Sequence, residues 1–170
     1  MRLAVVLGCL LAPLSVGATS PKDIKIGIHV LEFVTNTPPG RAGLGVVYDS
    51  RIRDSYDDAQ QIFEALTAPG QRLPDGLKPA LVDIRDLDDV TGLRALIVAD
   101  HMKAFYDQLA DYGRHRHTLV LSSDLDCVHA GKCTVGIASA PRVEVILGTQ
   151  LAQASGIQFS EAFRMMVTEY

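Results

Sequence analysis

The sequence contains no tryptophan, and aromatic residues make up only 6% of the chain. Leucine, isoleucine, valine and alanine must therefore supply the core in place of large rings. No sign of charge dominates either, because 16 basic and 20 acidic residues leave a formal net charge of −4. A weakly acidic, evenly mixed chain lacks the basic surface needed to bind nucleic-acid phosphates or anionic lipid. Partners of those two classes are not expected.

Long apolar runs are also missing. The run at Leu3–Leu14 is shorter than the ~20 residues of a membrane-spanning helix, and no later segment comes closer. It follows a positive start at Arg2 and precedes Val16-Gly17-Ala18, a pattern typical of a secretory leader. We expect residues 1–18 to be a signal peptide removed after Ala18, and residues 19–170 to be one exported domain without membrane insertion. A lipoprotein is the alternative, because Val6-Leu7-Gly8-Cys9 resembles a lipobox.

Motifs for nucleotide binding and catalysis are absent. The glycines of residues 40–45 precede a predicted strand instead of joining a strand to a helix, so the dinucleotide fingerprint is missing. No nucleophile elbow surrounds Ser122 or Ser123. The acidic cluster at residues 86–89 is interpreted as a solvated helix start. The sequence therefore predicts no cofactor, no catalytic residue and no enzyme.

Short apolar runs alternate with amphipathic segments along the rest of the chain. Ile24–Val34 fits both a strand and a helix, and we expect a helix. Strands are predicted at Gly45–Asp49, Ala80–Ile84, Leu93–Ala99, Thr118–Leu121, Thr134–Ile137 and Val143–Leu147, and further helices from Ser55 and at Lys103–Tyr112, Gln150–Ser155 and Ser160–Tyr170. This order predicts an α/β fold: an open, mostly parallel sheet with helices on both faces and an antiparallel edge.

Two helices carry more detailed predictions. Ser55 is expected to begin its helix as the N-cap, with Asp58 three residues later completing a capping box. In the last helix Phe163, Met166 and Tyr170 line one side, and we interpret them as part of the core. A groove for a partner is the alternative, in which Met165 and Met166 would serve as an adaptable interface.

Cys127 and Cys133 are the only cysteines left once the leader is removed. In an oxidising compartment this pair predicts a disulfide that closes a hairpin-like loop, worth roughly 2 kcal/mol by loop entropy. A redox-responsive bond is an alternative to a structural one. Zinc is another, because His115, His117 and His129 lie nearby in sequence, but the spacing matches no compact zinc pattern and no metal site is predicted.

The chain from residue 19 to 170 resembles the YfiR-like family of small bacterial periplasmic proteins, most clearly in its second half. In that family an N-terminal helix leads into a first strand, as Ile24–Val34 leads into Leu44–Asp49 here. In the second half, one part of the resemblance is an apolar strand, Leu96-Ile97-Val98-Ala99, followed by a second strand with a serine-rich turn, Leu119–Asp124. The other part is the ending, in which an extended run precedes a short helix, a glycine, a serine and a final apolar helix. These are Val143–Leu147, Gln150–Ser155, Gly156, Ser160 and Phe163–Met166.

The resemblance implies a fold like one lobe of a periplasmic solute-binding protein, a periplasmic location and a homodimer. It also implies a regulatory binding protein that represses a membrane-bound signalling protein, such as a diguanylate cyclase, by binding its periplasmic domain. Cyclic-di-GMP synthesis and biofilm formation would fall as a result. Cys127 and Cys133 match the family's later cysteine pair, whereas its earlier pair has no counterpart here. The alternative function is a solute-binding component of an uptake system, although one small domain lacks the second lobe that closes over a ligand.

Overall fold

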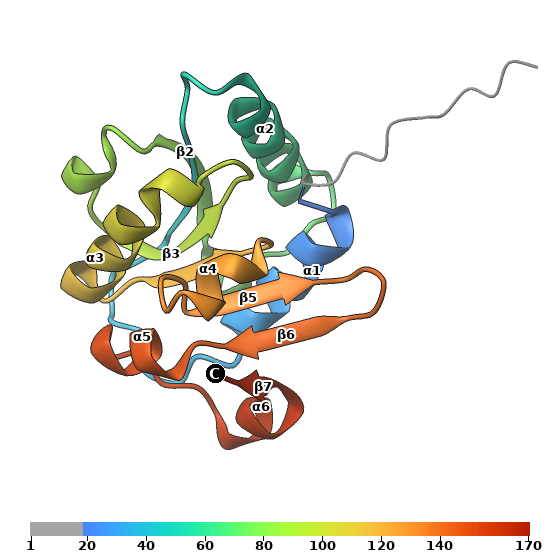
Figure 1. Ribbon diagram of the computed structural model, residues 1–170, viewed down its shortest axis with the longest axis vertical. Helices are drawn as coiled ribbons and strands as arrows, with labels where there is room; N and C mark the ends of the chain where they lie inside the picture. The colour runs from blue at the N-terminus through green and yellow to red at the C-terminus, as the bar shows by residue number, and fades with distance from the viewer. Residues whose placement is uncertain (1–18) are drawn as a thin grey trace, which may run out of the picture.

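The computed structural model describes residues 19–170, so the predicted leader and its cleavage site at Ala18 lie outside the described residues. A seven-stranded sheet runs through the molecule with helices on both faces, which confirms the predicted α/β fold (Figure 1). The strands are β1 (Gly43–Tyr48), β2 (Lys78–Asp83), β3 (Leu93–Val98), β4 (Leu119–Ser122), β5 (Val135–Ala138), β6 (Glu144–Leu147) and β7 (Thr168–Glu169). The helices are α1 (Pro21–Leu31), α2 (Arg53–Thr67), α3 (Tyr106–Arg116), α4 (Leu125–His129), α5 (Thr149–Ala154) and α6 (Glu161–Met166), with short 3-10 turns η1 (Pro74–Gly76), η2 (Leu87–Asp89) and η3 (Lys103–Phe105).

The sheet has the strand order β2-β1-β3-β4-β5-β6-β7. Neighbouring strands from β2 to β5 are parallel, and β5 pairs antiparallel with β6. The antiparallel pair predicted near the C-terminus is therefore present. It does not form the edge, however, because the unpredicted strand β7 pairs parallel with β6 outside it.

The two faces of the sheet bury two separate apolar clusters. Along β3, Ala95 and Ile97 pack on the side of α1 and α2, whereas Leu96 and Val98 pack on the side of α3 and α4. This alternation follows from the two-residue period of a strand. All six residues of β3 are buried, as expected for a central parallel strand covered on both faces.

Helix α1 begins where the sequence supplies both halves of a capping box. The Ser20 hydroxyl accepts from the Asp23 backbone N–H, the Asp23 carboxylate accepts from the Ser20 N–H, and Pro21 occupies the first turn. The helix prediction for this region is confirmed, although the helix ends at Leu31.

The predicted start of α2 is wrong. The helix begins at Arg53, and its N-cap Ile52 makes no side-chain capping bond. Ser55 is buried inside the helix, where its hydroxyl accepts from the Asp49 backbone N–H at 3.3 Å. Asp58 bonds to residues far away in the sequence, so it takes no part in a capping box.

The last helix is shorter than predicted. Helix α6 ends at Met166, because the chain then turns extended and pairs with β6. Phe163 is buried as predicted, but Met166 and Tyr170 are 65% and 62% exposed, so their assignment to the core is wrong. Within residues 19–170, no helix combines the length and the apolar character needed to cross a membrane.

Candidate functional site

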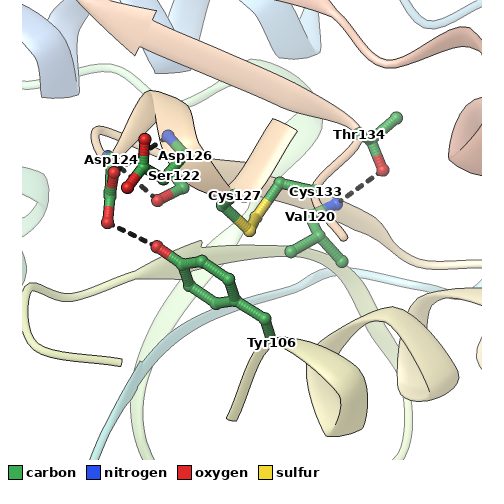
Figure 2. Close-up of a disulfide and its surroundings, with 8 residues drawn as sticks. All are labelled: Tyr106, Val120, Ser122, Asp124, Asp126, Cys127, Cys133 and Thr134. Carbon is green, nitrogen blue, oxygen red and sulfur yellow. Dashed lines mark hydrogen bonds between the residues drawn. A yellow bond between two sulfur atoms is a disulfide. The ribbon is translucent and has the colours of Figure 1, made fainter. Parts of the chain in front are cut away.

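The disulfide is the predicted site feature that the structure brings together. Cys127 lies on α4, Cys133 precedes β5, and their sulfur atoms are bonded with the Cα atoms 5.3 Å apart (Figure 2). Both residues are 0% exposed and belong to the apolar cluster on the α3 side of the sheet. The enclosed segment is not the predicted hairpin-like loop, because α4 fills its first half. Residues 124–134 are called the disulfide segment below.

The two ends of the disulfide segment are fixed by side-chain hydrogen bonds, and the first of them caps the short helix α4. The Asp124 carboxylate caps α4 by accepting from the Asp126 N–H at 2.9 Å, and the Ser122 hydroxyl accepts from the Asp124 N–H (Figure 2). At the other end the Thr134 hydroxyl accepts from the Val120 N–H at 3.2 Å. Five helical residues are too few to be stable alone, so these contacts and the disulfide hold α4 in place.

One face of η3 and α3 holds the disulfide segment through three polar contacts. The Tyr106 hydroxyl donates to the Asp124 carboxylate (Figure 2), Lys103 forms an ion pair with Asp126 at 2.7 Å, and Asp107 forms one with Lys132. Burial raises the pKa of Tyr106, and its bond to the Asp124 carboxylate raises it further. The phenol therefore stays protonated and keeps donating.

On its other side, the disulfide segment contacts the C-terminus. The rings of His129 on α4 and Tyr170 lie 5.1 Å apart in an edge-to-face arrangement. The Tyr170 backbone is fixed as well, because its N–H donates to the Leu147 carbonyl and its own carbonyl accepts from Thr149. Met165, Met166 and Tyr170 are 77%, 65% and 62% exposed. We call these three side chains the C-terminal apolar residues.

The histidines considered as zinc ligands do not converge. His115 contacts the Asp111 carbonyl, His117 contacts the Ser155 carbonyl, and His129 faces the Tyr170 ring. Both cysteines are oxidised, so they offer no thiolate. In the part of the chain that the structure describes, no three His, Cys, Asp or Glu side chains are grouped so that they could hold a metal ion.

The carboxyl ends of the parallel strands form a polar edge that the sequence reading missed. Asp49 follows β1 and binds Arg51, and Asp83 ends β2 and binds Arg85. In each case the arginine hydrogen bond lowers the pKa of the carboxyl group, so both aspartates are charged at neutral pH. Ligands of open α/β sheets bind at such an edge, where the strand order reverses.

A small cavity lies between α1 and strands β3 to β5, and its lining includes neither Asp49 nor Asp83. It is lined by Thr19, Asp23, Gly27 and neighbouring residues of β3 to β5, and it measures about 20 Å³. That is enough for about one water molecule and not for a solute. The hydroxyls of Ser122 and Ser123 bond to groups other than a histidine. The Ser122 hydroxyl accepts from the Asp124 N–H, and the Ser123 hydroxyl contacts the Thr19 hydroxyl.

A larger cleft lies away from the polar edge, between β6, α5 and α6. It has a volume of about 500 Å³, and Leu147, Ile157 and Phe159 give it an apolar wall. Arg164 lines it but is already paired with Glu169. No sequence motif marks this cleft, because its residues come from separate segments.

Comparison with known proteins places the fold. No family model and no curated protein matches the sequence. A conserved domain protein from Vibrio cholerae O1 biovar El Tor is similar in structure, with a TM-score of 0.63 and 11% identity over 88% of this chain and 59% of that one. The ABC domain from Streptococcus pneumonia in complex with L-Trp has a TM-score of 0.61 and 11% identity over 86% of this chain and 60% of that one. This chain thus spans about 60% of their length, and the likeness shows the fold alone.

Proposed function

We propose that residues 1–18 direct export and that the domain is a periplasmic regulatory binding protein without catalytic activity. It represses a membrane-bound signalling protein, such as a diguanylate cyclase, by binding that protein's periplasmic domain. The family resemblance suggests the partner class, and the α/β fold agrees with it.

The observation that carries the proposal is the contact between the disulfide segment and the exposed C-terminus. Cys127 and Cys133 fix α4, α4 carries His129, and His129 packs on the Tyr170 ring. Exposed methionines are adaptable contacts for a protein partner, and tyrosine is enriched in interfaces. The disulfide therefore supports the shape of a surface suited to protein binding, without itself touching the partner.

Repression follows if the domain binds the inactive conformation of its partner more tightly than the active one. To move that partner from 1:99 to 99:1 in favour of the inactive state, the affinities must differ by about 10⁴-fold. A domain that bound both conformations equally would repress nothing.

The test is capture of partners from detergent-solubilised cell envelopes, followed by binding measurements with the purified periplasmic domain of the protein recovered. We expect Met165→Glu with Met166→Glu to weaken that binding at least tenfold. Tyr56→Glu is the matched control, since Tyr56 is also exposed but lies on α2, far from α6 and β7 (Figure 1). Equal binding by wild type and the methionine variant would refute the role of Met165 and Met166 in partner binding. Recovery of no membrane signalling protein would refute the proposed regulatory function.

The disulfide has its own test. Binding by the oxidised protein is compared with binding by the reduced protein and by Cys127→Ser with Cys133→Ser. Weaker binding by the last two supports the link from α4 to Tyr170. Equal affinity of all three forms removes the disulfide from the mechanism.

Solute binding is the second candidate, and the cleft of about 500 Å³ favours it because that volume suits a small molecule. The chain crystallised with L-Trp shares the fold. A bound solute raises stability by RT ln(1 + [L]/Kd), so amino acids including L-tryptophan are screened by thermal shift. A shift that Arg164→Ala abolishes would support this function. No shift at millimolar ligand would exclude the amino acids tested.

A further inference from the structure

Thr19, the residue that follows the predicted cleavage site, is held in place by both its backbone and its side chain. Its backbone N–H donates to Asp58 Oδ1 at 2.8 Å, its hydroxyl donates to Asp58 Oδ2 at 2.9 Å, and the same hydroxyl contacts Ser123 Oγ at 2.9 Å. Thr19 is only 5% exposed. The start of α1 does not require these bonds, because Ser20 and Asp23 already cap that helix.

Asp58 is a buried carboxylate that forms no ion pair with the described residues 19–170. It lies on α2, is 3% exposed, and also accepts from the Asp100 backbone N–H at 2.8 Å. None of the ion pairs found among residues 19–170 includes it. The pKa of Asp58 is raised overall, because burial disfavours its charged form and the nearby Asp100 carboxylate adds to this. The hydrogen bonds from Asp100 and Thr19 offset only part of the rise. A positive charge next to Asp58 would offset the cost of burying its negative charge.

Leader removal would supply that charge. Hydrolysis of the Ala18–Thr19 peptide bond by a leader peptidase consumes one water molecule. The hydroxyl group goes to the Ala18 carbonyl carbon, and the proton goes to the Thr19 nitrogen. The released amine takes up a second proton at neutral pH, because α-amino groups have pKa values of about 7.7–8.0. The 2.8 Å bond to the Asp58 carboxylate then joins two opposite charges instead of a neutral donor and an anion.

We propose that Thr19 is the mature amino terminus and that its ammonium group forms a buried ion pair with Asp58. The pair joins the start of α1 to α2 and to the turns that follow β3 and β4, which contribute Asp100 and Ser123. Cleavage one residue away would move the ammonium by about 3.8 Å along the chain and lose the pair. The inference rests on the proposed leader removal after Ala18, and it is independent of any partner.

The first test compares residues 19–170 carrying a free Thr19 amine with the same chain acetylated at Thr19, each with and without Asp58→Asn. Acetylation keeps the N–H donor but removes the charge. We expect it to raise the equilibrium constant for urea unfolding about tenfold in the wild type and to have little effect in the Asp58→Asn variant. The same effect in both backgrounds, or no effect in the wild type, would overturn the proposal.

A second measurement remains informative if Asp58→Asn does not fold. The protein is exported with its own leader, and its mass identifies the first residue. The mature chain is then labelled with a limiting amine-acylating reagent at pH 7, natively and in urea. We expect Thr19 as the first residue, and at least tenfold protection of its amine in the native state, with the exposed Lys22 as the internal control. A different first residue, or equal labelling in both states, would refute the ion pair.

Discussion

Replacing both cysteines by alanine should destabilise the domain by a predictable amount. The bond closes a loop between residues six apart in sequence, for which loop entropy gives about 2 kcal/mol. For a domain of this size, each kcal/mol lowers the melting temperature by about 2–4 °C, so Cys127→Ala with Cys133→Ala should lower it by about 4–8 °C. Calorimetry measures this, and reductant added to the double variant should cause no further change. An unchanged melting temperature would refute the loop-entropy argument.

The same bond should be slow to reduce in the folded protein. Both cysteines are 0% exposed, and attack by a thiolate requires access to a sulfur atom. Reduction must therefore wait until the disulfide segment opens, and its rate should rise with urea concentration below the unfolding transition. Thiol trapping followed by mass spectrometry measures that rate. Rapid, urea-independent reduction would show that the segment opens freely, and would favour the redox-responsive alternative.

Three further predictions concern single side chains. Tyr106→Phe removes the hydroxyl that donates to Asp124 and should cost about 1.5–3 kcal/mol in urea unfolding, with an unchanged midpoint contradicting the contact. The pKa of Asp83 is lower in the folded chain than in the unfolded one, so its contribution to stability is present above about pH 4 and is lost as the pH falls. Asp83→Asn should therefore flatten the loss of stability between about pH 5 and pH 2, and an identical pH profile would argue against it. Gly136→Ala would place Cβ 2.6 Å from a Val128 methyl group and should destabilise the domain by roughly 1–3 kcal/mol. The control is Gly27→Ala inside α1, where Cβ would lie 3.5 Å from an Ile137 methyl group and the change should be neutral or stabilising. Equal effects of the two variants on thermal unfolding would refute the crowding at Gly136.

The central strands were predictable because their local pattern and their final environment agree. Leu93–Val98 is an apolar run interrupted only by Arg94, and the folded chain buries all six of its residues. The alternation of such runs with amphipathic segments was enough to predict a covered, mostly parallel sheet. A strand that is covered on both faces needs apolar residues at nearly every position, and this is the pattern that the sequence shows.

Prediction failed where distant contacts decide the outcome. Asp58 lies at the spacing of a capping box, yet it bonds to Thr19, which is 39 residues away in sequence. Helix α4 has only five residues, too few for periodicity to reveal. Met166 and Tyr170 lie at helical spacing from Phe163, but pairing of Thr168–Glu169 with β6 ends the helix between them. None of these contacts leaves a local signal.

The two edges of the sheet limit how copies of this domain can associate. One edge is β2, which carries Lys78 and Pro79, and a proline has no N–H to donate to another strand. The other edge is β7, which has only two residues, with the Glu169 carboxylate bound to Arg164. Neither edge is a good template for adding a strand from a second molecule. The fold thus resists edge-to-edge aggregation at high concentration, and a homodimer would have to form through side chains rather than by continuing the sheet.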